Sequence, residues 1–220
     1  MTEEMEQQDR FKELRDAFNA LAAYPSITAR KQAKAAIKAI KKEYNEGDAL
    51  KRNFIIYTIH HNLARISEIK DMKSAEWARN VKKLEGEQVA PYVFSSVTSH
   101  FSSVEGAMAL IDLLSELKGP LPSKVLAYHL SYYLMFQSLL FKLLRNRCLK
   151  ALGEARSTYA LSVLLSLAEA GVDEIERPLA EAISRWKERL EGSKSNAAKR
   201  WLSLIEGSFG AQEKKEGPYF

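Results

Sequence analysis

Four histidines are the side chains in this sequence best suited to metal binding or acid–base chemistry: His60, His61, His100 and His129. His60 and His61 are adjacent, so on a helix they point about 100° apart and do not readily bind one metal together. His129 lies in an apolar stretch, where a hydrogen-bonded core histidine is the expected role. Neither an H-E-x-x-H motif nor a Glu-x-x-His pair of the di-iron type occurs. We therefore predict no metal site and no catalytic residue.

Motifs that would bind phosphate or supply a nucleophile are also missing. Phosphate-binding loops need glycines because backbone N–H groups must approach the anion closely. The 10 glycines are scattered, and no G-x-x-x-x-G-K-[ST], G-x-G-x-x-G or G-x-S-x-G motif occurs. These absences predict a protein that is not an enzyme and uses no cofactor. The alternative left open is an enzyme with dispersed active-site residues, for example with His61 as a general base in a pocket.

Basic side chains form three clusters that could bind an anionic partner. Residues 30–42 and 118–150 carry no acidic residue, and residues 185–201 place cations beside Trp186 and Trp201. Basic side chains neutralise nucleic-acid phosphates, and aromatic faces can stack on unpaired bases. The candidate nucleic-acid-binding residues are Arg30, Lys31, Lys34, Lys38, Lys41, Lys42, Arg185, Lys187, Lys199 and Arg200. The alternative for each cluster is a solvated helix face, with the tryptophans half-buried in packing.

The overall composition favours a helical protein with a preference for anionic partners. Of the 220 residues, 46% are hydrophobic and 28% charged, and the formal net charge is +5 at pH 7. The 10 glycines and 6 prolines supply little turn material for an all-β fold, whereas the abundant Leu, Ala, Lys and Glu favour helices. We predict an all-α protein of about ten helices, with one domain over residues 1–207 and a mobile tail over 208–220.

Three features of the sequence indicate a cytoplasmic location. The first ten residues, MTEEMEQQDR, are acidic and polar, unlike a secretory signal or a transit peptide. Cys148 is the only cysteine, so it forms no intramolecular disulfide, and its apolar surroundings predict a buried, inert thiol. The longest apolar stretch, residues 125–141, includes His129 and Gln137 and is shorter than the about 20 residues of a membrane span. We therefore expect no membrane association.

Apolar residues spaced three and four apart predict the helices that must position these side chains. The predicted helices cover residues 3–23, 28–44, 49–70, 74–85, 91–102, 105–118, 123–152, 157–170, 176–191 and 195–206. The helix over 123–152 contains neither Gly nor Pro and is expected to form the buried central axis. Residues 87–104 alternate loosely like a strand, but one strand would have no partner and Pro91 suits a first helical turn. We therefore predict a helix there too.

A sequence pattern that occurs twice indicates an internal repeat. Residues 109–115 and 160–166 share the pattern A-L-x-x-L-L-S, and each is followed by a glycine and a second helix. This helix–turn–helix unit resembles a HEAT-like repeat, mainly over residues 151–186, and the pattern occurs a second time at 107–135. The resemblance covers about a third of the chain and departs from the family in the helix over 123–152, since a repeat helix is about half as long. It implies a short solenoid, with an irregular helical bundle as the alternative.

The expected function follows from this resemblance together with the missing catalytic motifs. Helical repeats supply extended binding surfaces, so the resemblance implies a scaffold that binds protein or nucleic acid. We predict a non-enzymatic interaction module, a scaffold or adaptor subunit of a larger complex with a protein partner. The alternative is direct DNA or RNA binding by the basic helix faces. The sequence leaves the identity of the partner and the oligomeric state open.

Overall fold

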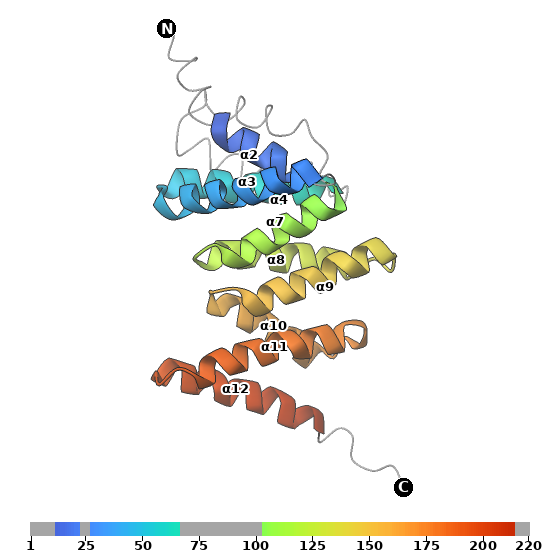
Figure 1. Ribbon diagram of the computed structural model, residues 1–220. Coiled ribbons are helices and arrows are strands. Elements are labelled where there is room, and N and C mark those ends of the chain that lie inside the picture. The colour runs from blue at the N-terminus through green and yellow to red at the C-terminus, as the bar shows by residue number, and fades with distance from the viewer. Residues whose placement is uncertain (1–11, 23–26, 67–102, 214–220) are drawn as a thin grey trace. The chain divides into compact units, whose positions relative to one another are not determined.

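The computed structural model describes residues 12–22, 27–66 and 103–213 (Figure 1). These residues form nine α-helices and one short 3₁₀-helix, and none of them is in a strand, which confirms the predicted all-α class. The elements are α2 (Lys12–Ala22), α3 (Ile27–Glu46), α4 (Ala49–Ile66), α7 (Val104–Glu116), α8 (Pro120–Tyr133), α9 (Leu139–Glu154), α10 (Thr158–Ala170), η1 (Asp173–Ile175), α11 (Glu176–Glu191) and α12 (Asn196–Glu213). The helices predicted over 74–85 and 91–102 lie outside the described residues.

The chain divides into two compact units, Met1–Leu117 and Lys118–Phe220. The division falls just before Gly119, whose φ of 91° is readily adopted only by glycine. Pro120 then occupies the first turn of α8, where a missing N–H costs nothing. Because a compact unit is not by itself an independently folding domain, the single domain predicted over residues 1–207 stays a prediction.

The first unit packs α2 and α4 against α3, and α7 against all three. The apolar face of α3 is buried, including Ala33, Ala36 and Ile40. Phe18 of α2 meets Phe54 of α4 edge to face, with ring centroids 6.4 Å apart. Asp48 caps the start of α4, since the backbone N–H of Lys51 donates to Asp48 Oδ1 over 2.8 Å.

The second unit places α9 and α10 against α8, and α11 against both α9 and α10. The last helix, α12, packs on α10 and α11. Fully buried leucines from α8, α9 and α10 form the core of this unit, among them Leu126, Leu152 and Leu161. Ser157 begins α10 by accepting a hydrogen bond from the N–H of Tyr159, and Gly171 ends it in the left-handed conformation.

The single long helix predicted over residues 123–152 is wrong. The chain forms two helices there, α8 of 14 residues and α9 of 16, joined by residues 134–138. The last turn of α8 tightens, because the N–H of Met135 donates to Tyr132 O instead of continuing the α-helical pattern. A 30-residue helix would be about 45 Å long, whereas the two shorter helices pack on each other. None of the described helices is long and apolar enough to cross a bilayer.

The last helix is longer than the sequence predicts. The prediction ends it near residue 206, but α12 extends to Glu213 and includes Gly207. Residues 208–213 of the predicted tail are therefore helical, and residues 214–220 lie outside the described part. A glycine within a helix costs about 1 kcal/mol relative to alanine, and the buried residues of α12, Ala198 and Ile205, precede it.

Candidate interaction surfaces

The six predicted basic residues of α3 form one face of that helix. At about 100° per residue, Arg30, Lys31, Lys34, Lys38, Lys41 and Lys42 fall within an arc of about 120°. Lys41 is half-buried and the other five are exposed. Between residues 30 and 42 this basic stripe is about 18 Å long. The buried residues Ala33, Ala36 and Ile40 lie beside the arc and attach the helix to its unit.

Carboxylates of the described residues neutralise little of the charge on the basic stripe. Lys41 Nζ lies 2.6 Å from Glu116 Oε2 of α7. None of the other five cations forms an ion pair with a carboxylate in the described ranges. The five exposed cations therefore give this helix a positive potential that would attract an anionic polymer.

Both predicted cations of α11 have a carboxylate within 4 Å, whereas only Lys41 of the six on α3 has one among the described residues. Arg185 Nη1 lies 3.3 Å from Glu154 Oε1 at the end of α9. Lys187 Nζ lies 3.9 Å from Glu191 Oε1, one turn further along α11. These ion pairs lower the net positive charge that the cluster can offer to a phosphate backbone.

Trp186 packs within its unit and is only 6% exposed, which agrees with the packing alternative for this cluster and leaves little of the ring for bases to stack on. Its Nε1–H donates to the carbonyl of Leu152 over 2.9 Å. The Arg189 guanidinium lies over the ring, 4.1 Å from the centroid, and donates to the carbonyls of Gly153 and Glu154. Burial lowers the pKa of Arg189, and Glu154 opposes this shift. The side chains of Trp186 and Arg189 thus hold the end of α9 against α11 through these hydrogen bonds.

The remaining predicted cations, Lys199 and Arg200, are exposed on α12 beside the half-buried Trp201. The six α3 residues belong to the first unit and the other four belong to the second. Neither unit by itself therefore brings all ten candidates together.

Large apolar side chains are exposed where α8 leads into α9. Met135 is 74% exposed and Leu139 is 72% exposed, with Phe136 and Leu143 more than a third exposed. We call these four residues the α8–α9 apolar surface. Leu139 and Leu143 are one turn apart on α9 and so share a face. Phe136 is held in place by the ring of Phe141, which stacks on it at 4.7 Å between centroids.

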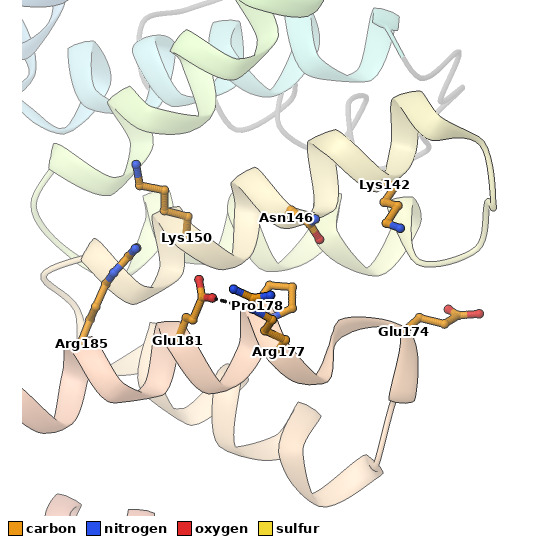
Figure 2. A pocket seen from close by; sticks show the side chains of 8 residues that line it. All are labelled: Lys142, Asn146, Lys150, Glu174, Arg177, Pro178, Glu181 and Arg185. Atoms are coloured by element: carbon orange, nitrogen blue, oxygen red, sulfur yellow. Dashed lines mark hydrogen bonds and ion pairs between the residues drawn. The ribbon is translucent and has the colours of Figure 1, made fainter.

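A groove of 540 Å³ lies beside this surface, between α9 on one side and η1 and α11 on the other (Figure 2). Helix α9 contributes Lys142, Asn146 and Lys150, η1 contributes Glu174, and α11 contributes Arg177, Pro178, Glu181 and Arg185. We call it the α9–α11 groove. Lys142 and Lys150 belong to the second basic cluster of the sequence, residues 118–150, and only the fold places them opposite α11.

The two carboxylates that line the groove already have protein partners. Glu181 Oε1 accepts a hydrogen bond from Arg177 Nε over 3.2 Å. Glu174 accepts one from Gln137 Nε2 over 2.7 Å, and its other oxygen lies 3.7 Å from Arg145 Nη1. Arg145 is buried, and its Nε and Nη1 make no hydrogen bond within the described residues. A buried cation with one distant counter-charge adds positive potential to this side of the unit.

The three histidines that the structure describes do not converge on a site. His129 is fully buried between the rings of Tyr128 and Tyr133, which confirms the predicted core position. His60 is buried, and His61 stacks on Tyr57 with ring centroids 5.9 Å apart. Among the described residues, no three His, Cys, Asp or Glu side chains are grouped to hold a metal ion. His100 lies outside the described ranges.

Comparisons of the chain with models of known protein families, with curated proteins and with solved structures found no match in any of the three. What these surfaces do is therefore inferred from their geometry and chemistry.

Proposed function

We propose that this protein is a non-enzymatic helical interaction module, a scaffold or adaptor that binds a protein partner through the α8–α9 apolar surface. The observation that carries the proposal is the exposure of Met135 and Leu139, each more than 70%, beside Phe136 and Leu143. Leaving apolar surface in water costs about 25 cal/mol per Å². A partner that covers these side chains recovers that free energy on binding.

The apolar surface differs from an ordinary scatter of exposed leucines. Single exposed apolar residues are normal, whereas adjacent ones mark interaction sites. Met135 and Phe136 precede α9 directly, and Leu139 and Leu143 continue from them along the helix. Phe136 is preorganised by Phe141, and methionine adapts its shape to a partner. The α8–α9 apolar surface thus combines an aromatic side chain held in place, Phe136, with a methionine, Met135, that can change its conformation.

The helical pairs of the second unit support a scaffold role. α8 and α9 pack on each other, as do α10 and α11, and each helix has 13 to 16 residues. Helix pairs of this size are the building units of helical-repeat scaffolds. The resemblance to HEAT-like repeats stays a prediction, as does the cytoplasmic location. Burial of the lone thiol of Cys148 is compatible with either redox environment.

Replacing the two leucines with serine tests the protein-docking proposal. We expect Leu139→Ser/Leu143→Ser to lose a specific partner in affinity purification from native cells, because the apolar contact is removed. Leu204→Ser is the matched control, since Leu204 is 54% exposed on α12 in the same unit. Circular dichroism should show both proteins folded. Equal recovery of every co-purifying protein by the double variant and by wild type would refute the proposal.

A second candidate function is binding of nucleic acid by the basic stripe of α3. Five exposed cations without described ion partners favour it. Five phosphate contacts on B-DNA predict a loss of affinity of about 500-fold between 50 and 200 mM salt. Fluorescence anisotropy with labelled DNA and RNA measures this loss.

Two charge-reversed variants localise such binding. Lys38→Glu should weaken it, whereas Lys187→Glu, which changes the net charge equally at an already paired position, should weaken it much less. No binding at 50 mM salt excludes this second function.

A further inference from the structure

One ridge of α9 carries both apolar and basic side chains. Leu139, Leu143, Asn146 and Lys150 follow one another three or four residues apart along it, and Lys142 is adjacent to Leu143. At about 100° per residue they lie within an arc of about 100°, and the ridge spans about 16 Å. The apolar surface and the α9 side of the groove are therefore one strip, which a single bound segment could contact.

The strip also has an excess of positive charge. Five cations lie in or beside the α9–α11 groove, namely Lys142, Arg145, Lys150, Arg177 and Arg185. Among the described residues, three carboxylates pair with these cations, Glu154, Glu174 and Glu181, so the cations exceed their paired carboxylates by two. Glu154 alone is shared by Lys150 and Arg185. Lys142 forms no ion pair with a described carboxylate.

We infer that the α9–α11 groove binds an acidic, amphipathic segment of the protein partner. Apolar side chains at one end of that segment cover Leu139 and Leu143, a carboxylate beside them faces Lys142, and carboxylates further along face Lys150 and Arg185. This inference rests on the proposed docking function and adds the chemistry of the partner. The direction of the segment is set by Leu139 at one end of the strip and by Lys150 and Arg185 at the other.

A peptide fits this strip better than a nucleic acid does. A polynucleotide carries a negative charge on every nucleotide. The carboxylates of Glu174 and Glu181, which line the groove, would repel those charges. A polynucleotide also has no apolar side chain to cover Leu139 at the other end of the ridge. An acidic amphipathic segment satisfies both ends, as helix-in-groove recognition does elsewhere.

Selection from a phage-displayed library of random 16-residue peptides on the immobilised full chain tests this inference. We expect selected peptides to carry more Asp and Glu than Lys and Arg, with apolar residues spaced three or four apart. A labelled peptide of the selected sequence should then bind in anisotropy, and Lys142→Glu should weaken it about tenfold. Leu139→Ser/Leu143→Ser should weaken it as well.

The matched control is Lys38→Glu, an equal charge change at an exposed lysine of the first unit. It should change the peptide Kd less than about twofold. Equal weakening by Lys38→Glu and Lys142→Glu would overturn the inference, because net charge alone would then explain acidic binding. Selection of neutral or basic peptides would overturn it while leaving the docking function intact. Selection of no peptide at all would overturn both.

Discussion

The two faces of α9 use the same residue type in opposite ways. Leu139 and Leu143 lie on one face and are exposed, whereas Leu144, Leu149 and Leu152 lie on the other and are fully buried. The helix is regular throughout, so secondary structure does not cause the difference. Burial of a leucine is decided by the face on which helical spacing places it. Helix α11 packs closely on α9.

A glycine allows that close approach. A Cβ built on Gly153 would lie 2.9 Å from the Cα and 3.1 Å from the Cβ of Ala182 on α11. Trp186 and Arg189 then donate hydrogen bonds to the last carbonyls of α9. Helix α11 therefore holds the end of α9, whereas the face that carries Leu139 and Leu143 is an exposed surface.

The rate of thiol modification should differ most between the two faces of α9. Cys148 is fully buried, so a thiol reagent reaches it only after the unit opens. A cysteine introduced by Leu143→Cys, in a Cys148→Ala background, should react about a thousandfold faster or more, as the opening equilibrium of a stable unit implies. Stopped-flow measurement with a chromogenic disulfide gives both rates. Comparable rates would mean that α9 opens as easily along its whole length.

Substitution of Gly153 should have the next largest effect. Gly153→Ala should lower the free energy of unfolding by about 1–3 kcal/mol, because the new methyl group pushes against the α11 backbone. Gly207→Ala is the control, since nothing lies within 4 Å of its added Cβ. That variant should gain roughly 0.5–1 kcal/mol from the lost flexibility of glycine. Urea denaturation measures both, and a stabilising Gly153→Ala would contradict the close contact.

Removal of the Arg189 guanidinium should have a smaller effect. Arg189→Met keeps the aliphatic stem but loses the two hydrogen bonds to the carbonyls of Gly153 and Glu154. We expect a loss of about 1–2 kcal/mol in the free energy of unfolding, discounted for the exposure of this side chain. Arg177→Met, which breaks only an exposed ion pair with Glu181, should cost about 0.3–0.5 kcal/mol. Equal costs would show that Arg189 does not fasten α9.

Leucines of the apolar surface should contribute least to stability. Leu139→Ser and Leu143→Ser should each change the free energy of unfolding by less than about 0.5 kcal/mol, as surface substitutions do. Leu144→Ala, on the buried face beside them, should cost about 2–5 kcal/mol. Thermal or urea unfolding distinguishes the two cases. A large cost at Leu139 would mean that this side chain supports the fold.

The sequence predicted most helices well because their periodicity is local. The helix predicted over 176–191 has the observed bounds of α11, and that predicted over 157–170 differs from α10 by one residue. The break at residues 134–138 was missed because neither Gly nor Pro marks it. Packing of α8 on α9 decides that reversal, and no short window of sequence contains this information.

The candidate surfaces were also predictable only where their residues lie within one helix. The basic stripe lies within one helix, so helical spacing alone aligned its cations. The pairing of Arg185 with Glu154 joins positions 31 residues apart and required the fold. The apolar surface was missed for a related reason, since Leu139 and Leu143 were assigned to a long buried helix. Once α9 begins at Leu139, these side chains lie at a helix start beside a turn.

Site-specific photo-crosslinking from Leu139 tests the docking surface most directly. Benzoylphenylalanine in place of Leu139 should, on irradiation in native cells, give a discrete adduct with one partner protein. The same group in place of Leu204, an isolated exposed leucine of α12, should not give that adduct. The absence of any adduct at position 139, or identical adducts at both positions, would contradict the proposal that this surface binds a specific partner.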